Sequence, residues 1–437
     1  MSRDDVSQHL RDLVESRDAA IVVIGQGYVG LPVAMRAVEV GFRSVVGFDL
    51  AEDRVTSLRA GRSFVGDVSD EELDTALRSG YTPSSDPSDL TGFDIAVISV
   101  PTPLRDGAPD LSYIESAGRT LASRMRPGCC VILESTTYPG TTSGLLAGLM
   151  SEGSGLDADE YFLGYSPERI DPGNTTHTLV NTPKVVSGTD GAALAAVDAF
   201  FSTLVDETVP VANTQEAELV KLLENTFRHV NIALVNELAM FARELDVDIW
   251  RAIDAASTKP FGFMRFTPGP GVGGHCLPID PSYLAWSVRQ QLGRPFRFVE
   301  LANDVNEHMP SHVHGRIASL LNERRKCLNG SRVLLLGLAY KRNTSDWRES
   351  PSIELADLLD ASGADVQVCD PNIPDVNATT LDRPLVDFTP ENLAAADVVV
   401  YLVDHDAFDR ATVSRHSTLV FDAINALREE EFTGDVL

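Results

Sequence analysis

The sequence predicts an α/β protein with two doubly wound parallel-sheet domains joined by long central helices. Three observations lead to this fold class. Short β-branched strands alternate with helical segments up to about residue 210. Residues 215–245 then contain no glycine or proline and predict one long helix. From Ser331 onward the alternation of strands and helices returns.

The first α/β region is expected to form a domain over residues 1–212. Its opening strand, AIVVI at 20–24, runs into glycines and then into a helical pattern. Further buried strands are expected at 44–50, 94–103 and 130–137, with helical segments between them. This order predicts parallel strands with crossover helices.

The central region, residues 213–325, is expected to be a helical connector. Apolar residues of its first helix recur at three- and four-residue spacing, as at Leu219, Leu222, Leu223 and Phe227. A second long helix is expected over about 299–325. Between them, the Pro- and Gly-rich residues 258–281 form either a linker or a site shaped by its backbone.

The second α/β region, residues 326–437, resembles the first one loosely. Strands are expected at 332–341, 365–371, 396–403 and 418–425, with a helix at 352–364. The strand ends GFDL and VCDP match between the two regions, but the second region lacks GxGxxG. Both regions are therefore expected to be Rossmann-like, and only the first is expected to bind a dinucleotide.

The composition excludes several kinds of protein. The formal net charge of −28 disfavours binding to nucleic acid and to anionic membranes, and we attribute it to solubility. The five cysteines match no zinc or CxxC spacing, so we expect a reduced cytoplasmic protein without a metal site. The acidic N-terminus lacks an apolar signal segment, and the apolar runs are too short to span a bilayer.

A cofactor site is expected where the first strand ends. Gly25, Gly27 and Gly30 form GxGxxG, whose glycines serve a tight turn, a close approach to a pyrophosphate and the packing of helix on sheet. Asp49 follows 19 residues after Gly30, close to the interval expected for a carboxylate that binds ribose hydroxyls. That carboxylate repels a 2′-phosphate, so NAD is favoured over NADP. Arg54 either binds the adenosine side of the cofactor or is a solvated helix residue.

The sequence around Cys276 indicates a nucleophile. Gly269, Gly271, Gly273 and Gly274 lie within the seven residues before it. So many glycines cost backbone entropy, which a loop tolerates where a ligand approaches its backbone closely. Surrounding amides and a neighbouring lysine would favour the thiolate. The remaining cysteines are interpreted as small buried hydrophobic residues: Cys129, Cys130, Cys327 and Cys369.

Polar residues elsewhere are candidates for the same chemistry. Lys221 and Asn225 are four residues apart and share one face of the predicted long helix, although a solvated face would show the same pattern. Glu168 and Asp171 lie in the turn-rich segment YSPERIDPGN at 165–174. Carboxylates near a cysteine and a lysine suit general-base catalysis, and by themselves they would be ordinary loop acids.

Together these motifs resemble the UDP-glucose/GDP-mannose dehydrogenase family over about residues 20–425. The motifs are GQGYVGLP, VPTP at 100–103, ESTTYPGTT at 134–142, YSPERIDPGN, ELVKLLENTFR at 218–228, GPGVGGHCLPIDP and GLAYKRNTSDWRESP at 337–351. STTYPGTT and KPFGFMRFTPGPGVGGHCLPIDPSYLAW look most similar to the branch that acts on UDP-N-acetylhexosamines, especially the UDP-N-acetylglucosamine 6-dehydrogenases.

The resemblance implies a four-electron oxidation of the C6 alcohol of a UDP-sugar to a carboxylate with NAD. In the family, a first hydride transfer gives an aldehyde, which a cysteine captures as a thiohemiacetal. A second transfer leaves a thioester, which water hydrolyses. The family's catalytic positions fall on Cys276, Lys221, Asn225, Asp280, Glu168 and Thr136.

The same resemblance implies the role of each residue. Lys221 and Asn225 would stabilise the developing oxyanion. Asp280 and Thr136 would position water and protons, and Glu168 would be the base in hydrolysis. Positions implied for NAD are Gly25, Gly27, Tyr28, Val29, Gly30, Asp49, Arg54, Pro101, Thr102, Ser135, Thr136 and Arg348. Positions implied for the UDP-sugar are Glu168, Arg169, Lys221, Asn225, Gly273, Gly274, Tyr340 and Lys341.

The family pattern also implies assembly and leaves the sugar open. The C-terminal domain would bind the UDP, and the central helices would form a homodimer or a larger homo-oligomer. UDP-glucose dehydrogenases carry a second glutamate four residues after the first, where this chain has Pro172, and the role of the nearby Asp171 stays open. UDP-N-acetylglucosamine is therefore the leading substrate, with UDP-N-acetylmannosamine and UDP-glucose as alternatives.

Two other classes of function fit parts of the sequence. A two-electron β-hydroxyacid dehydrogenase also joins a Rossmann-like domain to a helical one, but it would need neither Cys276 nor the second α/β domain. A non-catalytic NAD-binding module would need no nucleophile, and Cys276 together with Lys221 and Asp280 argues against it. The yield of NADH per sugar distinguishes the three classes.

Overall fold

The computed structural model describes residues 2–170, 174, 176–274, 276–347, 349–373 and 383–437, without the side chain of Cys276. The candidate residues Asp171, Pro172 and Arg348 lie outside the described residues. The chain divides into two compact units, Met1–Glu224 and Asn225–Leu437. The three domains expected from the sequence stay a prediction.

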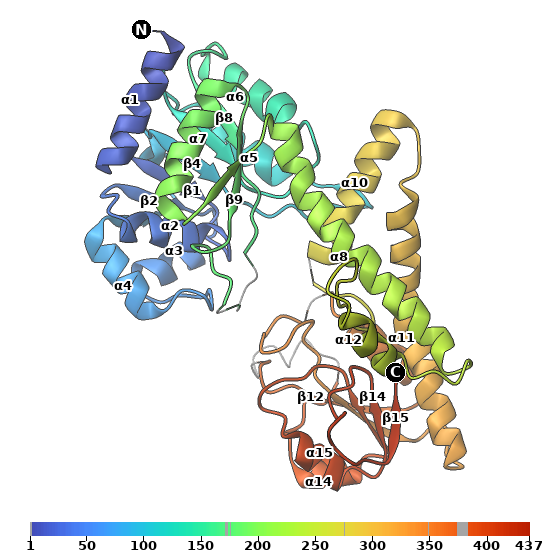
Figure 1. Cartoon of the computed structure of the whole chain (residues 1–437). Helices are drawn as coiled ribbons and strands as arrows, with labels where there is room; N and C mark the ends of the chain where they lie inside the picture. Colours follow the sequence, from blue (N-terminus) through green and yellow to red (C-terminus); the bar gives the residue numbers. More distant parts are fainter. Residues whose placement is uncertain (1, 171–173, 175, 275, 348, 374–382) are drawn as a thin grey trace. The chain divides into compact units, whose positions relative to one another are not determined.

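The N-terminal unit is built around an eight-stranded sheet in the order β10-β9-β8-β7-β4-β1-β2-β3. Figure 1 shows this sheet among the helices of the unit. β8 and β9 pair antiparallel, and the other neighbours pair parallel. The strands are β1 (Ile21–Ile24), β2 (Val45–Phe48), β3 (Tyr81–Ser84), β4 (Ile95–Ile98), β7 (Cys130–Leu133), β8 (Phe162–Tyr165), β9 (Lys184–Gly188) and β10 (Thr208–Pro210), beside the hairpin β5 (Leu104–Arg105) and β6 (Ala108–Pro109). The predicted doubly wound parallel fold is confirmed, and the antiparallel pairing of β8 with β9 departs from it in a way that periodicity cannot reveal.

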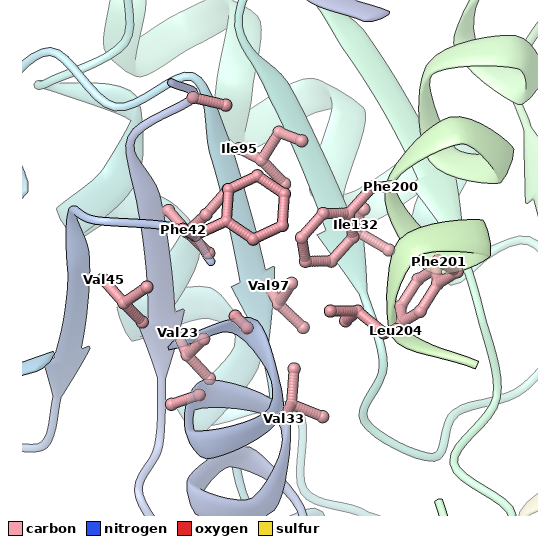
Figure 2. Close-up of a cluster of buried hydrophobic side chains, with 14 of the residues drawn as sticks. Val23, Val33, Phe42, Val45, Ile95, Val97, Ile132, Phe200, Phe201 and Leu204 are labelled. Carbon is pink, nitrogen blue, oxygen red and sulfur yellow. The ribbon is translucent and has the colours of Figure 1, made fainter. Parts of the chain in front are cut away.

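Helices cover both faces of this sheet because successive strand residues point to opposite sides. Val23 and Val97 point to one face, where they pack with Phe200 and Leu204 of α7 (Figure 2). Their neighbours on the strands point to the other face, toward α5 and α6. The helices of the unit are α1 (Arg3–Ser16), α2 (Gly30–Glu39), α3 (Glu52–Arg59), α4 (Asp70–Ser79), α5 (Ser112–Ala122), α6 (Ala147–Ser154) and α7 (Gly191–Leu204), with the short 3₁₀ segment η1 (Pro87–Leu90) and the π-helical segment η2 (Thr141–Leu146).

The C-terminal unit contains a five-stranded parallel sheet in the order β12-β11-β13-β14-β15. Its strands are β11 (Arg332–Leu336), β12 (Asp365–Cys369), β13 (Val398–Tyr401), β14 (Val420–Asp422) and β15 (Gly434–Val436). Val333 and Val400 point toward α11 and α12, and Leu334 and Val399 point toward α14 and α15. The second α/β region predicted from the sequence is thus confirmed.

The predicted long helices are also present. α8 (Thr214–Ala242) contains residues of both units, and α11 (Arg297–Glu323) lies in the C-terminal unit. The other described helices of that unit are α9 (Ile249–Ser257), α10 (Cys276–Leu292), α12 (Pro351–Ala361), α14 (Pro390–Ala395) and α15 (Arg410–His416). Among the described helices, none combines the length and the apolar character needed to cross a bilayer.

Candidate active site

The loop after β1 has the geometry of a pyrophosphate-binding turn. Gly25 has a φ of +89°, and a Cβ at this position would collide with the carbonyl oxygen of Ser99. A Cβ at Gly30 would collide with the carbonyl oxygen of Gly25, so α2 can pack this closely only with glycine there. A Cβ at Gly27 would meet nothing within 4 Å. This open position just before α2, whose N-terminus lacks a side-chain cap, fits an anionic pyrophosphate.

Asp49 is held beside this loop by backbone amides. Its Oδ2 accepts from the amide of Gln26 at 3.0 Å, and its Oδ1 accepts from the amide of Ala51 at 2.9 Å. The guanidinium of Arg54 lies 3.6 Å from Oδ2, so Arg54 is paired with Asp49 in this structure. Asp49 therefore lies where a doubly wound fold places the carboxylate for a ribose.

Gln26 and Tyr81 support the same loop, although the sequence motif did not single them out. Gln26 is buried, and its Nε2 donates to the carbonyl of Val23 at 2.9 Å. The hydroxyl of Tyr81 donates to Oε1 of Gln26 at 2.6 Å, and burial together with the charge of Asp49 raises the pKa of Tyr81. A Cβ at Gly47 would overlap both side chains. No motif marks Gln26, because the second position of GxGxxG accepts many residues.

Ser135 ties together the loops that follow β4 and β7. Its Oγ accepts from the amide of Val100 at 2.8 Å and donates to the carbonyl of Val100 at 2.8 Å. This fixes the approach to Pro101 and Thr102, at the carboxyl edge of the sheet where doubly wound folds bind ligands. Thr136 comes next and is half-buried.

Glu218, which the sequence analysis missed, holds the segment after Thr136. It is fully buried, and its Oε1 accepts from the amide and the hydroxyl of Thr142 at 2.8 and 2.7 Å. Its Oε2 accepts from the amide of Gly140 at 2.6 Å, so one carboxylate holds the start of η2. Burial raises the pKa of Glu218 above its usual value, although these hydrogen bonds oppose the rise. In the sequence, Glu218 looks like an ordinary charged helix residue.

The loop after β8 is attached to α8 by two ion pairs. Nζ of Lys221 lies 3.1 Å from Oε2 of Glu168, and both side chains are largely buried. One residue on, the guanidinium of Arg169 lies 2.7 Å from Oε1 of Glu224. The structure thus brings Glu168 and Lys221 together, and it excludes the interpretation of Lys221 as a solvated helix residue.

In the C-terminal unit, Asn225 contacts Asp280. Nδ2 of Asn225 donates to Oδ2 of Asp280 at 2.6 Å, and Asp280 is buried. Cys276 is the first residue of α10, and Asp280 lies one turn further along that helix.

Three of the four glycines before Cys276 are required by packing within the protein. Gly271 has a φ of +133°, and a Cβ there would lie 2.8 Å from Pro351. At Gly273 a Cβ would lie 2.7 Å from the carbonyl oxygen of Glu349, and at Gly274 it would lie 2.8 Å from the ring of Tyr340. These three glycines therefore let the loop pack on the segment after β11, which carries Tyr340 and Lys341. Packing within the protein therefore explains these three glycines without the approach of a ligand, which the sequence analysis expected as the reason.

A chain of buried amides holds the start of this loop. Oδ1 of Asn236 accepts from the amide of Gly269 at 2.9 Å, and its Nδ2 donates to Oδ1 of Asn306 at 2.9 Å. His229 is buried beside them, with Nε2 at 2.7 Å from Oδ1 of Asn303, and burial lowers the pKa of His229. Because Oδ1 of Asn303 is an acceptor, Nε2 of His229 is the donor in this hydrogen bond. Asn and His on a helix carry no motif, so sequence reasoning missed this support.

In the second α/β region, the acid that corresponds to Asp49 is used internally. Asp370 follows β12, and its Oδ2 accepts from the amides of Leu338 and Ala339 at 2.8 and 2.9 Å and faces Nε2 of His405 at 3.1 Å. The hydrogen bonds and His405 outweigh burial and hold the pKa of Asp370 below its usual value. The carboxylate of Asp370 thus holds the segment that follows β11.

The remaining cysteines divide into two groups. Burial raises the pKa of Cys129 to about 11 and of Cys369 to about 12, and Cys130 is also buried, as expected for inert core residues. The interpretation of Cys327 as buried was wrong, because it is exposed in the turn before β11, where its Sγ bonds the carbonyl of Asn329. In the described part of the chain, no three His, Cys, Asp or Glu side chains group as a metal site would require.

Comparison with known proteins shows the family to which the chain belongs. Models of the UDP-glucose/GDP-mannose dehydrogenase family match the chain in order: the NAD binding domain at residues 19–205, the central domain at 215–308 and the UDP binding domain at 334–429. The chain belongs to this family. It is an NAD-dependent UDP-sugar dehydrogenase, so the predicted enzyme class and cofactor are confirmed. The predicted site residues are not tested by this match and stay predictions.

Relatives of this dehydrogenase act on different sugars. The structure of a UDP-D-ManNAc dehydrogenase from Pyrococcus horikoshii matches with 32% identity and a TM-score of 0.86, covering 95% of this chain and 98% of that one. A UDP-N-acetyl-D-glucosamine 6-dehydrogenase from Pseudomonas aeruginosa is 35% identical over 81% of this chain and 83% of its own length. A UDP-glucose dehydrogenase from Pyrobaculum islandicum matches with 29% identity and a TM-score of 0.83, covering 95% and 97%. Similarity alone therefore leaves the sugar open.

Proposed function

We propose that the enzyme oxidises the C6 alcohol of UDP-N-acetylglucosamine to the carboxylate in two NAD-dependent steps, through a thioester on Cys276. The observation that carries this proposal is the pairing of four predicted residues, Glu168 with Lys221 and Asn225 with Asp280. A buried cation paired with a carboxylate suits oxyanion and general-base chemistry, whereas a non-catalytic module needs neither. A reduced cytoplasm suits an enzyme that depends on a free thiol.

The chain's own residues divide the work as follows. When bound, NAD⁺ accepts the hydride from C6 in each oxidation. The thiolate of Cys276 adds to the aldehyde and forms a C–S bond, while Lys221 and Asn225, four residues apart on α8, stabilise the oxyanion. After the second hydride has left, Glu168 removes a proton from water, which adds to the thioester and breaks the C–S bond. The sum is one alcohol, two NAD⁺ and one water converted to one carboxylate, two NADH and three protons.

The choice of sugar is tested with a substrate panel. The segment YSPERIDPGN has Pro172 where UDP-glucose dehydrogenases carry a second glutamate, which favours an N-acetylated sugar. We expect kcat/KM for UDP-N-acetylglucosamine to exceed that for UDP-glucose by about tenfold or more. NADH absorbance gives the rates, and the end point should be two NADH per sugar. A preference for UDP-N-acetylmannosamine or UDP-glucose would contradict the assignment, and one NADH per sugar would contradict the four-electron reaction.

We also propose that a second copy of the chain covers an apolar stripe of α8. In the C-terminal unit, Phe227, Leu234, Leu238 and Phe241 follow one another at intervals of 7, 4 and 3 residues and are 46–53% exposed. Heptad-like spacing of large apolar residues is the pattern by which two helices pack along one seam. An exposed apolar stripe of this kind is rare on a monomer, and the self-complementary seam favours a second copy.

Sedimentation velocity tests the assembly. We expect the wild-type enzyme to sediment as a dimer or larger, and Leu238→Glu to sediment as a monomer, because a charge in an apolar seam is costly to bury. Arg228→Glu, next to Phe227 but outside the stripe, is the matched control and should keep the assembly. A monomeric wild type, or an unchanged Leu238→Glu, would refute this proposal.

A further inference from the structure

A second ion pair, which the mechanism does not use, is buried in the N-terminal unit. Glu134 follows β7 and Lys184 begins β9, and their side chains are 0% and 4% exposed. Nζ of Lys184 forms an ion pair with Oε1 of Glu134, donates to the carbonyl of Pro167 at 3.0 Å and lies 4.9 Å from the ring centroid of Phe201. The cation thus has a carboxylate, a carbonyl and an aromatic ring as partners.

This pair holds the loop that carries the proposed base. Pro167 comes directly before Glu168, so Lys184 binds the backbone of that loop. One residue after Glu168, the guanidinium of Arg169 donates in return to the carbonyl of Pro183, next to Lys184. These reciprocal bonds clamp the peptides on both sides of Glu168 to the start of β9, while its carboxylate faces Lys221 at 3.1 Å.

The two pairs also interact through their charges. Burial raises the pKa of Glu134 above its usual value, against the opposing effect of Lys184. Smaller effects come from Glu168, which raises this pKa, and Lys221, which lowers it. The second oxygen of Glu134, Oε2, is buried and has no hydrogen-bond partner among the residues that the structure describes. Its other oxygen, Oε1, is paired with Lys184, which also reaches the loop of the Glu168–Lys221 pair through the carbonyl of Pro167.

Stability alone does not explain such a pair. Desolvation of two buried charges commonly offsets their attraction, so apolar residues of similar volume would stabilise the sheet as well or better. We propose that Glu134 and Lys184 are positioning residues, which fix the Glu168 loop and balance the charge around Glu168 and Lys221. This inference rests on the proposed role of Glu168 as the base.

The proposal predicts opposite effects of the two charges on the pH profile of kcat. Glu134→Gln leaves the cation of Lys184, which favours the carboxylate form of Glu168, so the acid limb should move to lower pH. Lys184→Met removes the cation, so the acid limb should move to higher pH. Each movement should be on the order of one pH unit. The double variant, which combines Glu134→Gln with Lys184→Met, has neither charge, so the charges balance again. The carbonyl of Pro167 has nevertheless lost its donor.

The experiment measures kcat, KM and the pH profile for these three variants, Lys184→Arg and Glu168→Gln. We expect the double variant to lose kcat about tenfold or more with little change in KM, because displacement of a reacting group by about 1 Å has effects of this size. Lys184→Arg keeps the charge and should restore the wild-type acid limb. Val186→Ala, on the same strand and buried, is the control for a purely structural loss and should lower Tm without moving the limb.

The outcomes separate the two proposals. If Glu168→Gln keeps the wild-type rate, the base assignment in the proposed function fails. If Glu168→Gln is inactive but the double variant has wild-type kcat, or both single variants keep the wild-type acid limb, the positioning role fails by itself. If the acid limb of the kcat profile moved by the same amount in Val186→Ala, the positioning role would also be overturned. Should a single variant not fold, the double variant decides, because it leaves no unpaired buried charge.

Discussion

Cys276→Ser is expected to lower steady-state NADH production by at least about 10³-fold, because the covalent nucleophile is the group on which both later steps depend. Serine is rarely ionised at neutral pH, and an oxygen ester transfers its acyl group less readily than a thioester. Binding of NAD and of the nucleotide sugar should survive, because neither depends on sulfur. Intact mass after incubation with both substrates should reveal any trapped sugar ester.

The other cysteines provide the controls. Cys327→Ser should keep a near-normal rate and stability, because the side chain is exposed. Cys129→Ser and Cys369→Ser should also keep near-normal rates, but they should lose stability because each places a hydroxyl in an apolar core. If Cys276→Ser still produced two NADH per sugar at most of the wild-type rate, the covalent mechanism would have to be abandoned.

Lys221→Met is expected to lower kcat by about 10²- to 10³-fold, the usual loss when one donor to an oxyanion is removed. Methionine preserves much of the side-chain volume, so the loss should come from the missing charge. It also leaves Glu168 without its ammonium partner in a largely buried place. Steady-state kinetics give kcat, and titration with NAD should show unchanged binding.

A lysine of the C-terminal unit serves as the matched control. Lys326 forms an ion pair with Asp397, but its side chain is half exposed, so Lys326→Met should leave kcat unchanged and cost at most about 1 kcal/mol of stability. A Lys221→Met enzyme with wild-type kcat would exclude Lys221 from oxyanion stabilisation. If Lys221→Met failed to bind NAD, misfolding would be the explanation. A comparison of its thermal unfolding temperature with that of Lys326→Met would reveal this.

Local patterns in the sequence predicted the parts of the molecule that depend on neighbouring residues. The positions of Gly25, Gly27 and Gly30 follow from a strand that turns directly into a helix. That geometry depends only on residues that are close in sequence. The length of α8 could be predicted for the same reason, because the absence of glycine and proline acts locally. The pairing of Lys221 with Glu168 could be suspected only through the family motifs, since 53 residues separate them.

Buried charges could not be predicted, because their burial depends on segments that are distant in sequence. Lys184 and Glu134 are 50 residues apart, and each looks like an ordinary strand-end residue until β7 and β9 fold into one sheet. Glu218 reaches Thr142 across 76 residues for the same reason. Cys327 shows the opposite error: cysteine is usually buried, but a turn before β11 keeps this one at the surface.

The polar face of α8 in the C-terminal unit restricts which changes in chain length the enzyme tolerates. Asn225, His229 and Asn236 contact α10, α11 and the glycine loop, at intervals of four and seven residues. An α-helix turns by about 100° per residue, so one residue inserted between Asn225 and His229 would rotate one set of contacts away from the other. No loop lies between them to absorb the change. A substitution on this face removes the hydrogen bonds of one side chain, whereas a single insertion or deletion between these residues would put the contacts on its two sides out of register.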